Sequence, residues 1–312
     1  IENEHLDAVL MSFAVCAESL PNMIEGCWDK INSFVKKHCT PRQGEAHSSG
    51  SQQPSVPTSV VVSAIKWLGN SLINSPLKGS RPLFLREGER VMSSMRRFVR
   101  DSEHSAVRLA AGNAVLKCAR RNEIEAVVDA RTWQVLGQLV KDKDEYVRDE
   151  FCERVKKACC STSKRPLGKP TKYGALLVLR GLDEDISAKS DAQKQISEIL
   201  NAAKRVFFQY AKTPNLPDHT LDLLRNLYRP ESLVVYAAHL IAHYYGRKDD
   251  EKYSSQRRLI NFLLKSFPSA GFYNFSYLME LLRCVDNSDD VLRKTKYTRT
   301  VAELMILTMK SK

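Results

Sequence analysis

Two histidines have the type and spacing that most directly suggest chemistry. His239 and His243 are separated by four positions, which places both imidazoles on one side of a helix. Zinc proteases use this spacing with a glutamate directly after the first histidine, but here Leu240 follows His239. The surrounding run SLVVYAAHLIAHYY is strongly apolar, and no third ligand is evident. We therefore predict that the pair packs in the core and binds no metal; a metal or a partner contact is the alternative.

Other reactive groups give weaker signals. The chain has 8 cysteines, none with CxxC spacing, which favours a reducing compartment without disulfides. Lys156 and Lys157 could lower the pKa of a thiol in the pair Cys159-Cys160, although simple packing explains that pair as well. The turn Asp286–Asp290 lacks the glycine and trailing glutamate of a calcium loop and is predicted to cap a helix. Phosphate-loop and nucleophile-elbow motifs are absent, so we predict no catalytic residue, no cofactor and no enzyme.

The charge pattern favours anionic partners. Lys and Arg number 48 against 36 Asp and Glu, a formal net charge of +12. Groups of basic residues near helix ends could form an edge that contacts DNA phosphates, or could simply be solvated groups that suit the helix dipole. The candidate phosphate contacts are Arg96, Arg97, Arg100, Arg120, Arg121, Lys164, Arg165 and Lys169.

Two stretches about forty residues apart repeat one arrangement, which is typical of HEAT-type helical hairpins. Each has an acidic turn, then Val-Arg, then apolar residues at helical spacing. We expect the aspartate to cap the second helix of a hairpin, the valine to be buried and the arginine to reach the acidic turn of the next hairpin. The residues concerned are Asp101, Val107 and Arg108 in the first stretch, and Asp142, Val147 and Arg148 in the second.

Composition extends this pattern to the whole chain of 312 residues. Glycine and proline are scarce, and Leu, Ala, Lys, Arg and Glu dominate, which favours helix. We predict an all-α HEAT-repeat α-solenoid of about seven helical hairpins, with no membrane-spanning segment. A hairpin is expected over 1–39, a flexible Pro/Gly/Ser-rich loop over 40–59 and the solenoid over 60–312. Because the chain begins with isoleucine, we expect it to be part of a longer protein.

Three passages resemble the Pds-type regulators of sister-chromatid cohesion, which are HEAT-repeat proteins. EHSAVRLAAGNAVLKCAR (Glu103–Arg120) is similar to their "EHVRLAAG" hairpin, and RPESLVVYAAHLIAHY (Arg229–Tyr244) to their "LPEYVVPYMIHLLAH" helix. YTRTVAELMILTMKSK (Tyr297–Lys312) resembles their closing "YTVCDVAMNIIMSKS" helix. The order and spacing also fit, from about residue 94 to the end of the chain; the basic loop at 161–170 differs.

The resemblance implies a non-enzymatic scaffold, located on chromatin in the nucleus, that docks on the kleisin subunit of cohesin. Family members maintain cohesion and, with the release factor Wapl, unload the ring. A generic HEAT adaptor, or a nucleic-acid-binding scaffold that uses the basic edge, remains the alternative.

Overall fold

The structure, a computed structural model, describes residues 5–40, 56–160, 167, 169–211, 217, 228–244, 249–269 and 274–311. Helices and turns account for the secondary structure of these ranges, so the prediction of an all-α chain is confirmed. The chain divides into two compact units, Ile1–Leu139 and Val140–Lys312. Most of the loop predicted over 40–59 lies outside the described residues.

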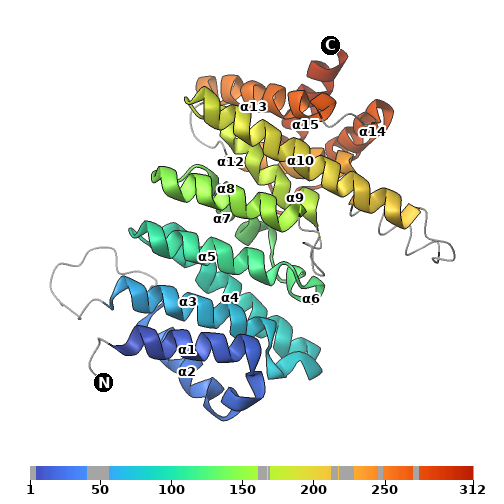
Figure 1. The fold of residues 1–312 in the computed structure, drawn as a ribbon. Coiled ribbons are helices and arrows are strands. Elements are labelled where there is room, and N and C mark those ends of the chain that lie inside the picture. Colours follow the sequence, from blue (N-terminus) through green and yellow to red (C-terminus); the bar gives the residue numbers. More distant parts are fainter. Residues whose placement is uncertain are drawn as a thin grey trace. The chain divides into compact units, whose positions relative to one another are not determined.

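The first unit is a succession of helices (Figure 1). Prolines stand in the first turns of η2, η3 and α4, where the missing N–H has no helical partner to lose. The elements are α1 (Leu6–Ser19), the 3₁₀ helix η2 (Pro21–Cys27), α2 (Trp28–His38), α3 (Thr58–Ile73), the 3₁₀ helix η3 (Pro76–Gly79), α4 (Arg81–Asp101), α5 (Ser105–Cys118), α6 (Asn122–Glu125) and α7 (Ala130–Val140).

Within this unit α3 packs between α1 and α5, so alternate helices form one layer of a helical stack (Figure 1). Gly69 permits the close approach of α3 to α5, because a Cβ there would lie 3.3 Å from that of Ala114. Asn70 on α3 joins both neighbours: its amide donates to the carbonyl of Ala14 at 2.8 Å, and its oxygen accepts from Lys117 at 2.9 Å. The stack is therefore held by apolar packing and by a polar bridge across three helices.

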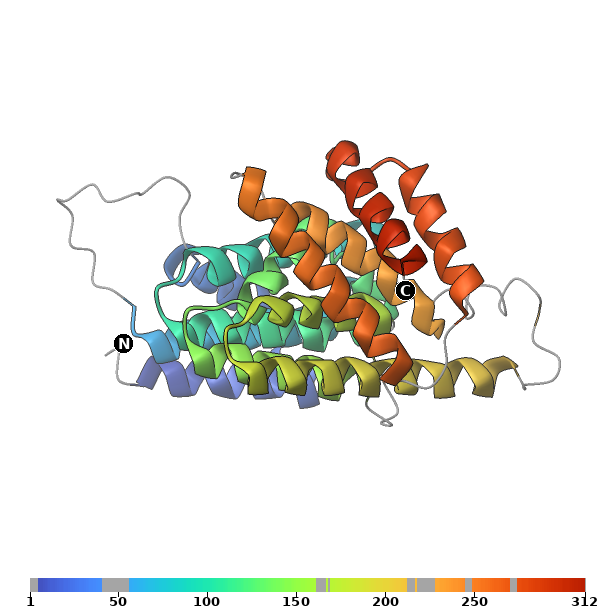
Figure 2. The ribbon, with the colours of Figure 1, turned by 90° about the horizontal axis from the view of Figure 1, so that it is seen from above.

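The second unit continues with helices of more varied length. Figure 2 shows α14 and α15 side by side at the C-terminal end. The elements are α8 (Glu145–Cys160), α9 (Pro170–Gly174), the 3₁₀ helix η4 (Ala175–Leu182), α10 (Ile186–Ala211), the 3₁₀ helix η5 (Pro230–Ser232), α12 (Leu233–Tyr244), α13 (Asp249–Ser269), α14 (Phe275–Asp286) and α15 (Thr295–Lys310).

The short helix η4 lies at the centre of the second unit. Every residue from Ala175 to Gly181 is buried, and the helix packs against α10, α12 and α13. Gly181 lets α13 approach, because a Cβ at this position would stand 2.7 Å from the ring of Phe262. This run, ALLVLRGL, places one cation, Arg180, inside the unit.

The repeated Val-Arg motifs adopt the same local structure in both units. Val107 and Val147 are buried at the start of α5 and α8. Arg108 donates to the carbonyls of Ser102 at 3.0 Å and Glu103 at 2.8 Å, and Arg148 donates in the same way to Asp142 at 2.7 Å. These described contacts tie each arginine to the turn before its own helix. For Arg148 this differs from the ladder predicted between hairpins, and for Arg108 the ladder contact stays a prediction.

The predicted caps need correction. Asp101 is the last residue of α4, so the N-cap of α5 falls to His104, which makes no side-chain cap hydrogen bond. At α8 the capping carboxylate is Asp144, which accepts from the N–H of Tyr146 at 3.0 Å. Asp142 instead accepts from the N–H of Asp144 at 2.9 Å and so shapes the turn. The capping residue of α8 therefore lies two positions after Asp142, because the carboxylate of Asp142 accepts from an N–H of the turn and not of the helix.

Replacing Val147 or Val107 by alanine is expected to lower the free energy of unfolding by about 1–3 kcal/mol, since each deletion leaves a small cavity. Urea denaturation followed by circular dichroism measures this. Val15→Ala is the matched control, because Val15 is 54% exposed on α1 and its loss should cost no more than about 0.5 kcal/mol. Equal and negligible effects at all three positions would contradict the register of the repeat.

The hydropathy of the described helices bears on whether any of them could span a membrane. None of them combines the length and the apolar character that crossing a bilayer requires.

Candidate functional site

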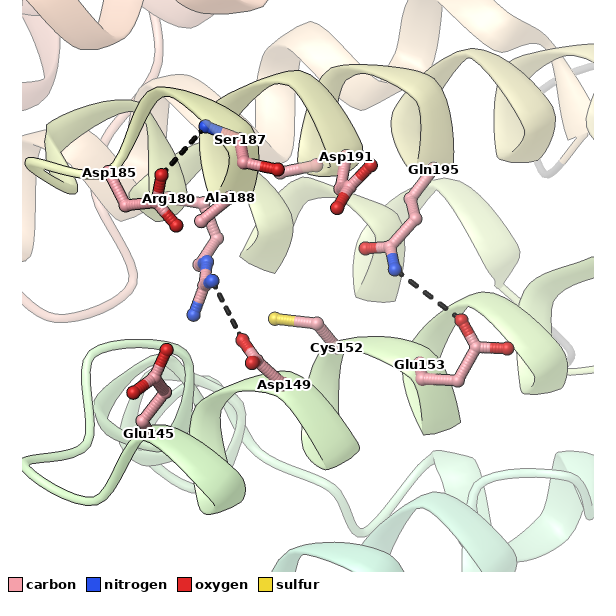
Figure 3. Close-up of a pocket in the computed structure, with 11 residues that line it drawn as sticks. Glu145, Asp149, Cys152, Glu153, Arg180, Asp185, Ser187, Ala188, Asp191 and Gln195 are labelled. Carbon is pink, nitrogen blue, oxygen red and sulfur yellow. Dashed lines mark hydrogen bonds and ion pairs between the residues drawn. The ribbon is translucent and has the colours of Figure 1, made fainter.

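A groove with a volume of about 390 Å³ lies between the first halves of α8 and α10 (Figure 3). Its lining is unusual for a basic chain, because it holds five carboxylates and one guanidinium. The carboxylates are Glu145, Asp149, Glu153, Asp185 and Asp191, and the guanidinium is that of Arg180. The groove therefore carries net negative charge on a chain whose formal net charge is +12.

Arg180 extends from η4 to the groove, and its side chain is only 6% exposed. Its Nη2 donates to Asp149 at 2.8 Å, and its Nε pairs with Asp183 at 2.7 Å. Lys141 also binds Asp183, at 2.8 Å, so one carboxylate serves two cations. The third guanidinium nitrogen, Nη1, is buried and has no hydrogen-bond partner among the described residues. A buried donor of this kind is rare in proteins and calls for an acceptor.

Two thiols of α8, Cys152 and Cys160, are not activated. Burial raises the pKa of Cys152, which lines the groove, to about 12, although Arg180 lowers it slightly. Burial also raises the pKa of Cys160 to about 11, and the carboxylate of Glu198 adds to this effect. Lys156 acts in the opposite direction but is itself paired with Glu153 and Glu198. The neighbouring lysines thus do not lower the pKa of Cys160 below its ordinary value. Cys159 is buried, and its thiol donates to the carbonyl of Pro170 at 3.4 Å, which suits a packed side chain.

The two histidines of α12 meet a third group that the sequence analysis missed. Asp290, from the turn before α15, accepts from His243 Nε2 at 2.7 Å and from His239 Nδ1 at 3.1 Å through the same oxygen, Oδ2. The hydroxyl of Thr298 donates to this oxygen too, and the N–H of Leu292 donates to Oδ1 at 2.7 Å. The aspartate side chain is fully buried, so the cluster joins α12 to the base of α15 inside the second unit.

The pKa shifts of this cluster follow from its contacts. Burial raises the pKa of Asp290, but the hydrogen bonds from Thr298, His243 and the Leu292 N–H outweigh it and hold that pKa well below its ordinary value. Burial and the neighbouring His243 lower the pKa of His239, against the pull of Asp290. The fold therefore favours an ionised carboxylate beside an uncharged His239.

These three side chains have donor atoms within 4.8 Å of one another, so the argument from a missing third ligand fails. The distances supply a different reason to expect no metal. Two ligands on tetrahedral zinc lie about 3.3 Å apart, whereas Asp290 contacts His243 directly at 2.7 Å. The cluster has the geometry of hydrogen bonds.

We accordingly predict that the purified protein carries no stoichiometric zinc. Metal analysis at neutral pH after dialysis against zinc is the measurement, and the double variant His239→Ala, His243→Ala is the control for incidental binding. One equivalent of zinc that disappears in the double variant would show that the cluster is a metal site.

The basic residues are distributed over both units. Arg96, Arg97 and Arg100 lie on α4, and Arg120 and Arg121 follow α5; Lys169 precedes α9 in the second unit. Lys164 and Arg165 lie outside the described residues. Arg96 binds Asp129 at 2.9 Å and Thr132 at 2.7 Å, which offsets much of its charge. Phosphate binding by this set stays a prediction.

Sequence reasoning did not find the acidic groove. One signal was present: Arg180 is a lone cation in an apolar run, and a buried arginine needs carboxylate partners. Which carboxylates lie near Arg180 depends on how α8 and α10 pack, and the sequence does not show that packing.

The chain is similar to a known protein family and to several of its members. The chain matches the model of the family described as "Sister chromatid cohesion protein PDS5 protein" over residues 1–312. Human and mouse "Sister chromatid cohesion protein PDS5 homolog A" are each 25% identical over 170 residues, which is 54% of this chain and 12% of theirs. Human homolog B is 25% identical over 164 residues, 52% of this chain and 10% of its own length.

The matched segment thus spans only about a tenth of these relatives. A solved engineered protein covers 99% of the chain at 13% identity, but its TM-score of 0.26 carries no inference. The family match includes the first 93 residues, where sequence motifs alone indicated only helices. Because it extends over all 312 residues, the chain belongs to the PDS5 family of sister chromatid cohesion proteins.

Proposed function

We propose that this chain is a non-enzymatic helical scaffold that regulates sister-chromatid cohesion in the nucleus. It would do so by binding the kleisin subunit of the cohesin complex and by working with the factors that release or maintain cohesin on chromosomes. The observation that carries the proposal is the family match over residues 1–312.

The helical architecture supports this function. Stacked helices offer long surfaces on which extended segments of a partner can lie, and such stacks act as scaffolds. The described thiols with raised pKa values suit a structural role, since a reactive cysteine needs an accessible thiolate.

The test is co-purification of the tagged protein from nuclei, followed by binding of the purified protein to the kleisin subunit. Recovery of kleisin, together with premature separation of sister chromatids after depletion, is the expected result. Recovery of a different assembly without cohesin would instead favour a generic helical adaptor.

Rescue of the depleted cells tests whether cohesion requires the folded chain. The wild-type chain should restore cohesion, whereas a variant destabilised in the second unit, such as Asp290→Ala, should restore it only at reduced protein level. Full rescue by an unrelated helical-repeat protein would contradict the proposal.

A further inference from the structure

We draw no further inference here: the strongest candidate, the exposed apolar face of α1 around Val9 and Val15, carries nothing because none of the described contacts shows what covers it.

Discussion

Replacing Asp290 by alanine is expected to lower the free energy of unfolding of the second unit by about 3–5 kcal/mol. The carboxylate is fully buried and accepts hydrogen bonds from His239, His243 and Thr298. Its removal leaves these donors buried without an acceptor, and each costs about 1–3 kcal/mol. Denaturant unfolding measures the loss, and hydrogen exchange should show it first in α12 and α15.

Asp289→Ala is the matched control for this prediction. Its side chain is 94% exposed, and its described ion pair with Arg299 is long, at 3.9 Å. The change should be within about 0.5 kcal/mol. If Asp290→Ala were as mild as Asp289→Ala, the cluster would not be a structural link between α12 and α15.

The same cluster predicts the direction of the pH dependence. The pKa of Asp290 lies below its ordinary 3.8, so its contribution is present above that value and is lost as pH falls through the lower folded-state pKa. The pKa of His239 is also lowered, from 6.5, so the neutral form is favoured by folding and stability is lost as pH falls below 6.5. Both effects make acid destabilising.

The Tm of the second unit should therefore fall between about pH 7 and about pH 5, and His239→Asn should flatten that fall. Differential scanning calorimetry at matched ionic strength is the measurement. A rise in Tm on acidification would mean that an imidazolium–carboxylate pair outweighs the burial of His239, and would reverse the assigned direction.

The histidine cluster illustrates what sequence can and cannot supply. Helical periodicity placed His239 and His243 on one face, because that relation is local. Asp290 follows His243 by 47 positions, and only the packing of α13 and α14 returns the chain to α12. The turn containing Asp290 was predicted as a cap, and it does bind its own backbone through Leu292, but its buried role was not predictable from composition.

The repeat shows the same division between local and long-range information. The buried Val107 and Val147 follow from spacing within one helix, so the prediction succeeded. The arginines beside them were assigned to a neighbouring hairpin, but both donate to carbonyls of their own turns, which also need donors; the contact of Arg108 with the next hairpin stays a prediction. The α8–α10 groove escaped prediction because its six charged residues come from α8, η4, α10 and the turn before α10.

The first unit has its own central side chain, Trp67. It is fully buried on α3, its Nε1 donates to Asn32 Oδ1 at 2.9 Å, and its ring lies 5.2 Å from that of Trp28 and 6.3 Å from that of Phe13. The hydrogen bond to α2 joins residues 35 positions apart, so the apolar spacing within α3 does not predict it.

Trp67→Ala is expected to lower the free energy of unfolding by about 3–5 kcal/mol, because it empties the space where α1, α2 and α3 meet. Trp67→Phe keeps a ring but leaves the oxygen of Asn32 without its donor, so it should cost about 1–3 kcal/mol. Met23→Ala is the control, since Met23 is 75% exposed and should change stability by no more than about 0.5 kcal/mol. Urea denaturation measures the loss of unfolding free energy in each variant. Hydrogen exchange locates the loss, and protection should fall in α1 and α3 before α5. If Trp67→Ala cost no more than Trp67→Phe, the hydrogen bond and not the packed ring would hold these helices together, because both variants lose the indole N–H.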